Sequence, residues 1–227
     1  MPYANPHLHQ PVSTFGAATA RDAALAVILV HGRGQSPALM HEMVVSRFAR
    51  PDIAWLAPLA AENSWYPERF IEPLEVNEPL LSQALERLDT LSEELRMLGF
   101  PYESQILMGF SQGACLCSEF VWRQRRRYRA LVAFTGGLIG PQGMLRDTSH
   151  RNFQGMPVLF STWEQDPFVP AKSVRESAAL FQTVGADVTL KVEAGTEHGI
   201  RDAEIGYARA TLDHSASQVH LSSARSR

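Results

Sequence analysis

One serine of this chain lies in a setting that can make it a nucleophile. An apolar run at residues 106–108 leads into Gly109-Phe110-Ser111-Gln112-Gly113, and a helical pattern follows at once. Gly-x-Ser-x-Gly is typical of a nucleophile elbow, a tight strand-to-helix turn that lifts the serine hydroxyl above the edge of a sheet. Its two glycines are expected where strand and helix backbones approach too closely for a Cβ atom. The pattern is weak by itself and needs a base, an acid and oxyanion donors elsewhere in the chain.

A serine nucleophile needs a neighbouring base to take its proton, and the chain offers eight histidines. Most of them lie near the termini, in a predicted helix or in an irregular stretch. His31 ends a predicted strand, where we expect it to hold a glycine-rich loop by a local hydrogen bond. His198 follows the last predicted strand, from which an imidazole can reach Ser111. We therefore predict that His198 is the base; the alternative is a turn histidine beside Glu197.

The base needs a buried carboxylate that fixes its tautomer and stabilises the imidazolium. Asp166 is best placed, because it comes soon after a predicted strand at residues 157–162. Glu164 is the competitor, whereas Asp202 and Glu204 are expected to cap or charge the first turn of the last helix. Ser, Asp and His then follow one another in the order found in α/β hydrolases, which differs from the chymotrypsin and subtilisin orders.

Two further segments are predicted to touch a substrate. A tetrahedral oxyanion needs preorganised donors, and we expect the backbone N–H groups of Gln112 and Arg33 to supply them. The alternative for the Arg33 loop is a phosphate cradle, but the loop lacks the glycine spacing of such cradles. Trp65, Tyr66 and Phe70 form an aromatic cluster at the same edge, either as a wall for the substrate or as ordinary core packing.

These residues must be positioned by strands that alternate with helices. Apolar runs predict strands near residues 24–30, 53–58, 105–109, 130–135, 157–162 and 187–192, with a short edge strand at 12–15. Periodicity and caps predict helices near 37–49, 79–98, 112–123, 170–184 and 202–213, the second of them capped by Asn77. This alternation predicts an α/β fold of three layers, with helices on both faces of a mostly parallel sheet. We expect an N-terminal extension at 1–23, one domain at 24–213 and a disordered tail at 214–227.

The composition is that of an ordinary globular protein, with 45% apolar and 20% charged residues. A net charge of −3 argues against nucleic-acid binding and against an anionic-membrane partner. No apolar run approaches the length of a membrane span, and the first residues lack the pattern of a secretory signal. Cys115 and Cys117 are badly placed to bond each other and are read as buried residues of a reducing compartment. We predict a cytoplasmic protein and leave open whether it forms a homodimer.

Four motifs together resemble those of the phospholipase/carboxylesterase family of α/β hydrolases, which includes acyl-protein thioesterases. They are Val30-His31-Gly32-Arg33-Gly34, Gly109-Phe110-Ser111-Gln112-Gly113-Ala114, Asp166-Pro167-Phe168-Val169-Pro170 and Glu197-His198-Gly199. Trp65-Tyr66-Pro67 and Gly136-Gly137-Leu138-Ile139-Gly140 are more similar to the bacterial esterase branch. The resemblance covers about residues 24 to 212.

The resemblance implies the α/β-hydrolase fold and a serine hydrolase that cleaves carboxylic ester or thioester bonds. The substrate would be a small molecule with a short or medium acyl group, and an acyl-enzyme would form on Ser111. The implied triad is Ser111, Asp166 and His198, with no metal and no organic cofactor. Arg33 and Gln35 depart from the family, which often has a small or apolar residue and an Asp there; the charge of Arg33 could favour an acidic or polar substrate.

Two other functions stay open. A dienelactone-hydrolase-like ring-opening enzyme of aromatic breakdown would use a cysteine nucleophile, whereas the elbow residue here is Ser111 and Cys115 lies a full turn along the helix. A non-catalytic binding module would not need a complete set of catalytic side chains. The sequence therefore favours the esterase.

Overall fold

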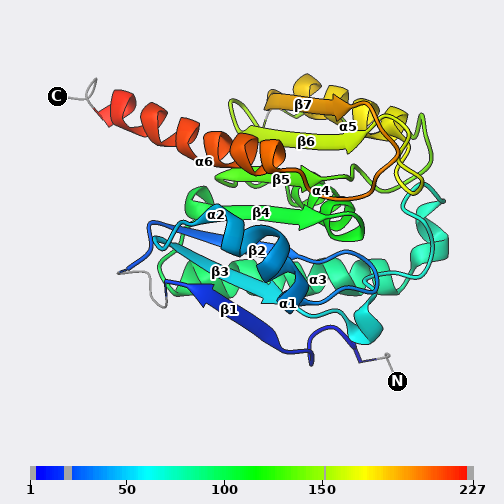
Figure 1. Ribbon diagram of the computed structural model, residues 1–227, viewed down its shortest axis with the longest axis horizontal. Helices are drawn as coiled ribbons and strands as arrows, with labels where there is room; N and C mark the ends of the chain where they lie inside the picture. The colour runs from blue at the N-terminus through cyan, green and yellow to red at the C-terminus, as the bar shows by residue number, and fades with distance from the viewer. Residues whose placement is uncertain (1–3, 18–21, 151, 224–227) are drawn as a thin grey trace.

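A seven-stranded sheet forms the centre of the protein in a computed structural model, which describes residues 4–17, 22–150 and 152–223 (Figure 1). Its strands are β1 (Val12–Gly16), β2 (Leu25–Val30), β3 (Ile53–Pro58), β4 (Gln105–Phe110), β5 (Ala130–Phe134), β6 (Pro157–Trp163) and β7 (Asp187–Glu193). They are ordered β1-β3-β2-β4-β5-β6-β7. β1 runs antiparallel to β3, and the other neighbouring pairs are parallel. The predicted sheet, including its edge strand, is confirmed.

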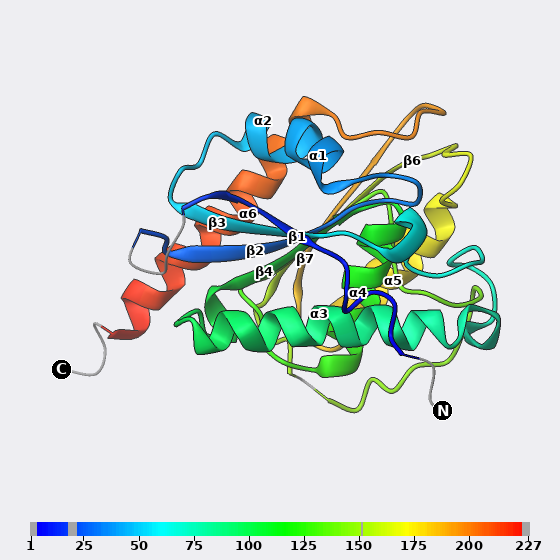
Figure 2. The same ribbon diagram turned by 90° about the horizontal axis from the view of Figure 1, so that it is seen from below.

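Helices cover both faces of this sheet (Figure 2). On one face lie α1 (Pro37–Met40), a π-helical turn (His41–Val45), α2 (Ser46–Phe48) and α6 (Asp202–Ser223). On the other face lie α3 (Leu80–Met97), α4 (Gln112–Gln124) and α5 (Ala171–Thr183). This arrangement confirms the three predicted layers. Within the part of the chain that the structure describes, no helix combines the length and the apolar character needed to cross a membrane.

Strand β2 shows why the central strands have continuously apolar sequences. All its residues are buried. Ala26, Ile28 and Val30 belong to the core under α3, α4 and α5, while Val27 and Leu29 belong to the core under α1, α2 and α6. A strand enclosed on both faces has no solvent side on which polar residues would be favourable.

The ends of two helices differ from the prediction. Asn77 does not cap α3; it is buried, and its Oδ1 atom accepts a hydrogen bond from Glu68 N at 2.8 Å. The carboxylate of Glu78 instead accepts from the backbone N–H of Ser82 in the first turn, at 3.0 Å. α6 continues to Ser223, beyond its predicted end near residue 213. The division of the chain into an extension, a domain and a disordered tail stays a prediction.

The N-terminal segment packs against the sheet and α3. Besides the pairing of β1 with β3, the side-chain amide of Asn5 donates to Gln83 O at 2.8 Å and to Glu86 Oε2 at 2.9 Å. Arg87 of the same helix donates to Gln10 O at 3.1 Å. The segment is therefore part of the tertiary structure and packs on the edge of the sheet and on α3.

Candidate active site

The candidate nucleophile lies at the junction of β4 and α4. Ser111 has φ 54° and ψ −120°, a left-handed conformation that costs a non-glycine residue on the order of 1–3 kcal/mol. Its backbone N–H donates to Phe134 O at 2.9 Å, which ties the turn to β5. A Cβ atom on Gly113 would lie 2.2 Å from Val30 O, and one on Gly109 would lie 2.5 Å from Gly113 C. Both glycines are therefore required by the close approach of strand and helix.

Three side chains from different loops form a continuous chain of hydrogen bonds. His198 Nε2 lies 2.9 Å from Ser111 Oγ, and His198 Nδ1 lies 2.7 Å from Asp166 Oδ2. The other carboxylate oxygen, Oδ1, accepts from the backbone N–H groups of Phe168 and Val169, each at 2.8 Å. A carboxylate can only accept, so Nδ1 carries the imidazole proton and Nε2 accepts from the serine hydroxyl. The structure thus brings together the three residues of the predicted triad.

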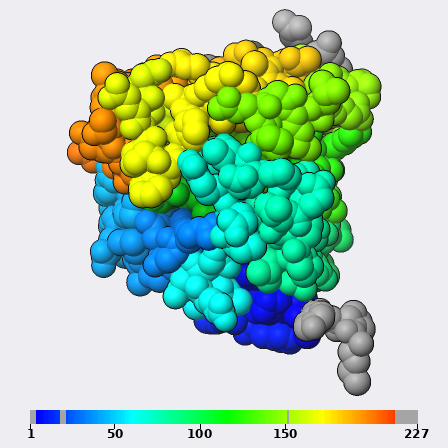
Figure 3. All heavy atoms as spheres, turned by 90° about the vertical axis from the view of Figure 1, so that its right-hand side faces the viewer, coloured from blue at the N-terminus to red at the C-terminus, as the bar shows by residue number. Residues whose placement is uncertain are grey.

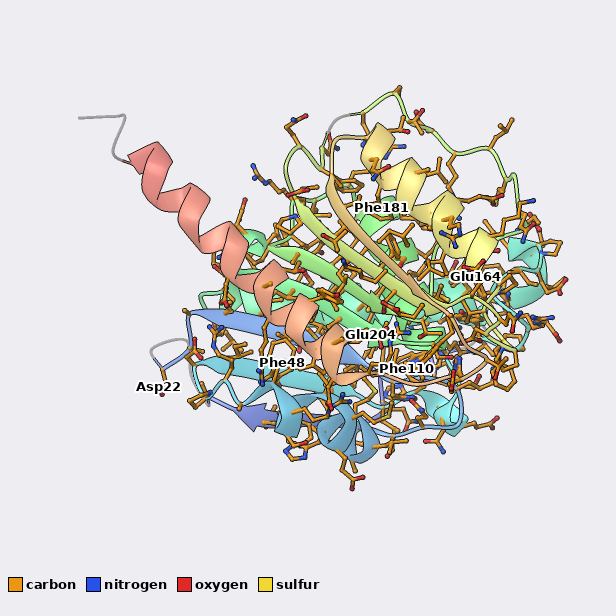
Figure 4. All side chains as sticks on the ribbon, turned by 45° about the horizontal axis from the view of Figure 1, so that its top comes forward. Asp22, Phe48, Phe110, Glu164, Phe181 and Glu204 are labelled. Carbon is orange, nitrogen blue, oxygen red and sulfur yellow. The ribbon has the colours of Figure 1, made fainter. Side chains whose placement is uncertain are left out.

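Two aromatic rings hold the imidazole of His198. The ring centroids of Phe110 and Phe168 each lie 5.0 Å from that of His198. Phe168 is not among the predicted site residues, although its position two residues after Asp166 is a signal that points to it. The competing carboxylate, Glu164, is exposed and pairs with Arg175 of α5 at 2.5 Å, and Figure 4 shows it apart from Phe110. Glu164 therefore makes no contact with the imidazole.

The loop after β2 passes directly beside the serine. A Cβ atom on Gly32 would lie 3.2 Å from Ser111 Cβ. Gln35 holds the loop through two hydrogen bonds with Gly32. Its side-chain Oε1 accepts from Gly32 N at 3.0 Å, and its backbone N–H donates to Gly32 O at 3.1 Å. The backbone N–H groups of Arg33 and Gln112 form no hydrogen bond with the described residues. Both can donate to an oxygen that develops negative charge.

Behind this loop, His31 and Trp65 form a buried polar frame. His31 Nδ1 lies 2.7 Å from Gly32 O, and its Nε2 accepts from Ala60 N at 3.0 Å. These bonds include the local contact expected of this histidine, and burial lowers its pKa. Trp65 is fully buried, and its indole N–H donates to His31 O at 2.9 Å. Trp65 does not line the cavity described below, so its position corresponds to the core-packing alternative.

The side chain of Gln112 connects the elbow to the aromatic loop. Its Oε1 accepts from Trp65 N at 3.0 Å, and its Nε2 donates to Tyr66 O at 2.8 Å. The sequence motif predicts a role for the backbone of Gln112 alone. The side-chain role depends on a loop 46–47 residues away in the chain, which no local pattern indicates.

A cavity of about 470 Å³ opens over Ser111 and His198. Tyr66 and Phe70 of the predicted aromatic cluster line it. Figure 3 shows a hollow on this face, where the blue, cyan and yellow segments meet. Cys115 reaches the same cavity, but it is buried, and burial raises the pKa of its thiol to about 12. Across residues 4–17, 22–150 and 152–223, no three His, Cys, Asp or Glu side chains are arranged to hold a metal ion.

This chain is similar to known proteins both in sequence and in structure. The model of the phospholipase/carboxylesterase family matches residues 16–215. The crystal structure of a phospholipase/carboxylesterase from Dyadobacter fermentans is 35% identical, covering 89% of this chain and 96% of that one, with a TM-score of 0.80. Carboxylesterases from Mesorhizobium loti and Bacillus cereus share the fold at 17% and 16% identity, with TM-scores of 0.70 and 0.69, and each match covers 91% of this chain and 95% of the other. No curated protein matches.

Proposed function

The chain belongs to the phospholipase/carboxylesterase family of α/β hydrolases, and from that membership we propose that it is a serine esterase acting through an acyl-enzyme on Ser111. The observation that carries the proposal is the hydrogen-bonded chain from Ser111 through His198 to Asp166. Each of the three follows a different strand, at the edge where parallel strands of an open sheet present their carboxyl ends. The chain order Ser, Asp, His also agrees with this fold.

In the proposed first step, the hydroxyl of Ser111 attacks the acyl carbonyl carbon. Nε2 of His198 takes the hydroxyl proton as the new C–O bond forms. Asp166 keeps the imidazole in the tautomer that can accept and stabilises the positive charge that results. The imidazolium then gives its proton to the departing alcohol or thiol, which leaves the acyl group on the serine.

The negative oxygen of the tetrahedral intermediate requires donors that are already in place. We assign this role to the backbone N–H groups of Arg33 and Gln112. Support comes from the lack of any other hydrogen bond from these two groups within the described residues. The N–H of Gln112 also lies at the start of α4, where the positive end of the helix dipole favours a negative charge.

Water completes the proposed cycle by attacking the acyl-enzyme carbonyl. His198 takes a proton from this water and returns one to the serine oxygen, so the carboxylic acid leaves and Ser111 is restored. The cavity of about 470 Å³ suits a small or medium acyl group. An ester and a thioester differ only in the leaving atom, and both fit this scheme.

A direct test is the hydrolysis of p-nitrophenyl esters of graded chain length, together with labelling by a fluorophosphonate probe. We expect wild type to turn over short and medium chains and to be labelled, and Ser111→Ala to lose at least about 10³-fold in kcat and all labelling. If wild type neither hydrolyses nor becomes labelled, the protein is not a serine esterase. If Ser111→Ala keeps full activity, another residue is the nucleophile.

The ring-opening alternative depends on a cysteine nucleophile. Reaction requires the thiolate, and burial raises the pKa of Cys115 to about 12 and that of Cys117 well above its usual value. Iodoacetamide should therefore leave the ester hydrolysis of the folded protein unchanged and modify both thiols only after denaturation. Loss of activity that parallels the alkylation of Cys115 would support the alternative instead. The two free thiols are also consistent with the proposed cytoplasmic location.

A further inference from the structure

Two arginine side chains connect the loops around the mouth of the cavity. Arg33, in the loop after β2, donates to the carbonyl oxygens of Pro67 and Glu68, the second at 2.6 Å. Arg69, in the same loop as those carbonyl groups, donates to Phe168 O at 3.2 Å. Phe168 lies in the loop after β6, so three loops from separate parts of the chain are joined. Both arginines line the cavity that contains Ser111 and His198.

The positive charges of these arginines are not neutralised by carboxylates. Within the described residues, Arg33 and Arg69 bind carbonyl oxygens and form no ion pair, in contrast to Arg146 and Arg175, which pair with Glu119 and Glu164. A carbonyl group carries no net charge, so each guanidinium keeps its full positive charge. Glu68 is the acidic residue among those that line the cavity. Among the side chains that line the cavity, the two positive charges of Arg33 and Arg69 therefore outnumber the one negative charge of Glu68.

The charge of Arg33 also acts on the wall of the cavity. Tyr66 lines the cavity, and burial raises the pKa of its hydroxyl. The positive charge of Arg33 acts in the opposite direction and lowers this pKa. A negative group of a substrate in the same cavity would be attracted by the same field.

We propose that the site prefers esters that carry a carboxylate in addition to the ester group, and that Arg33 and Arg69 are the residues that determine this preference. The inference rests on the proposed esterase function and deepens it by naming a substrate class. Arg33, Glu68 and Arg69 are exposed, so a single charge should change binding by no more than several-fold, and salt should weaken the effect. Glu68 opposes the preference, and its removal should strengthen it.

The experiment compares kcat/KM for two pairs of esters that differ in one charge. In the first pair the acyl part carries it, mono-p-nitrophenyl adipate against methyl p-nitrophenyl adipate. In the second pair the alcohol part carries it, 4-acetoxybenzoate against methyl 4-acetoxybenzoate. The relevant pair is the one in which wild type has the higher kcat/KM for the anionic ester. For that pair, we expect the ratio of kcat/KM for the anionic ester to kcat/KM for the neutral ester to fall about fivefold in Arg33→Gln and in Arg69→Gln. The same ratio should rise in Glu68→Gln and fall in 0.5 M NaCl.

Two further variants separate charge from loop positioning. Arg33→Lys keeps the charge but cannot form the same pair of carbonyl contacts, and its ratio should stay closer to wild type than that of Arg33→Gln. Arg96→Gln removes a charge from the end of α3, where the side chain pairs with Glu93, and should leave the ratio unchanged. If the arginine variants lower kcat/KM equally for both esters of each pair, the arginines only hold the loops and the proposal is wrong. If no ester is hydrolysed by wild type, the failure lies with the proposed function.

Discussion

The carboxylate of Asp166 makes separate contacts with its two oxygens. Oδ1 is held by the backbone N–H groups of Phe168 and Val169, and Oδ2 faces His198. Its side chain is 0% exposed, whereas that of His198 is 18% exposed. Because both oxygens are engaged, the carboxylate cannot rotate away, and the imidazole is held in one orientation. In the proposed mechanism this orientation decides whether Nε2 faces the serine as an acceptor.

We predict that Asp166→Asn lowers kcat for p-nitrophenyl acetate by about 10³- to 10⁴-fold, because an amide N–H facing Nδ1 would favour the wrong imidazole tautomer. The matched control is Glu164→Gln, which changes a carboxylate two residues away that is exposed and pairs with Arg175. Its kcat should stay within about twofold of wild type. Circular dichroism should show both variants folded. Equal effects of the two substitutions would contradict the role assigned to Asp166.

At the scale of elements, the junction of β4 and α4 depends on contacts between backbones. Gly113 lies in the first turn of α4 directly against the end of β2, at Val30 and His31. The start of the helix therefore packs on the strand that leads to the proposed oxyanion loop. This contact fixes the serine and the Arg33 loop relative to each other without any side chain between them.

We predict that Gly113→Ala destabilises the protein by at least about 2 kcal/mol and lowers activity, since its Cβ atom would overlap a strand carbonyl. The control, Gly206→Ala, lies in α6, where an added Cβ atom meets nothing within 4 Å. That substitution should raise the free energy of unfolding by up to about 1 kcal/mol, because alanine favours a helix more than glycine does. Urea denaturation measures both. A Gly113→Ala protein as stable as wild type would show that the junction can open.

At the scale of the whole molecule, the N-terminal segment is linked to the active edge through buried rings. His7 Nδ1 accepts from Ala61 N at 3.1 Å, and its ring centroid lies 5.5 Å from that of Trp65. The ring of Trp65 lies in turn 5.0 Å from that of His31, which holds the loop beside Ser111. Burial lowers the pKa of both His7 and His31.

These two pKa values predict a loss of stability in acid. A histidine whose pKa is lowered on folding binds its proton more readily in the unfolded chain. Its contribution to the stability of the fold is therefore fully present above the ordinary histidine pKa of 6.5. The contribution is lost as the pH falls below 6.5 and through the folded-state pKa. The midpoint temperature of unfolding should therefore fall between pH 7.5 and pH 5.

The variants His7→Asn and His9→Asn test the source of this pH dependence. Asn at position 7 can still accept from Ala61 N but does not titrate, so the slope of stability against pH should become smaller. His9 is exposed, and its substitution should leave the slope as in wild type. If His7→Asn leaves the slope of stability against pH unchanged, the acid sensitivity arises from other groups.

Much of the architecture could be predicted from the sequence because local forces determine it. Strands buried on both faces require continuous apolar runs, and the turn at Ser111 requires two glycines that leave a visible pattern. Parallel strands present their carboxyl ends at one edge, so residues after strands could be expected to meet there. Asp166 and His198 were found in this way, and the structure places both in a hydrogen-bonded chain with Ser111.

Only the tertiary structure decided the contacts between distant loops. Trp65 and Tyr66 are neighbours in the sequence, yet one supports His31 from behind and the other lines the cavity. The contacts of Arg33 and Arg69 span 34 to 99 residues of the chain. Which surface a loop side chain meets depends on how separate crossovers bring their loops together, and no short pattern carries that information. The sequence alone therefore determined the fold class and the chemistry of the predicted triad, while the shape and charge of the cavity mouth were decided by the packing of the loops.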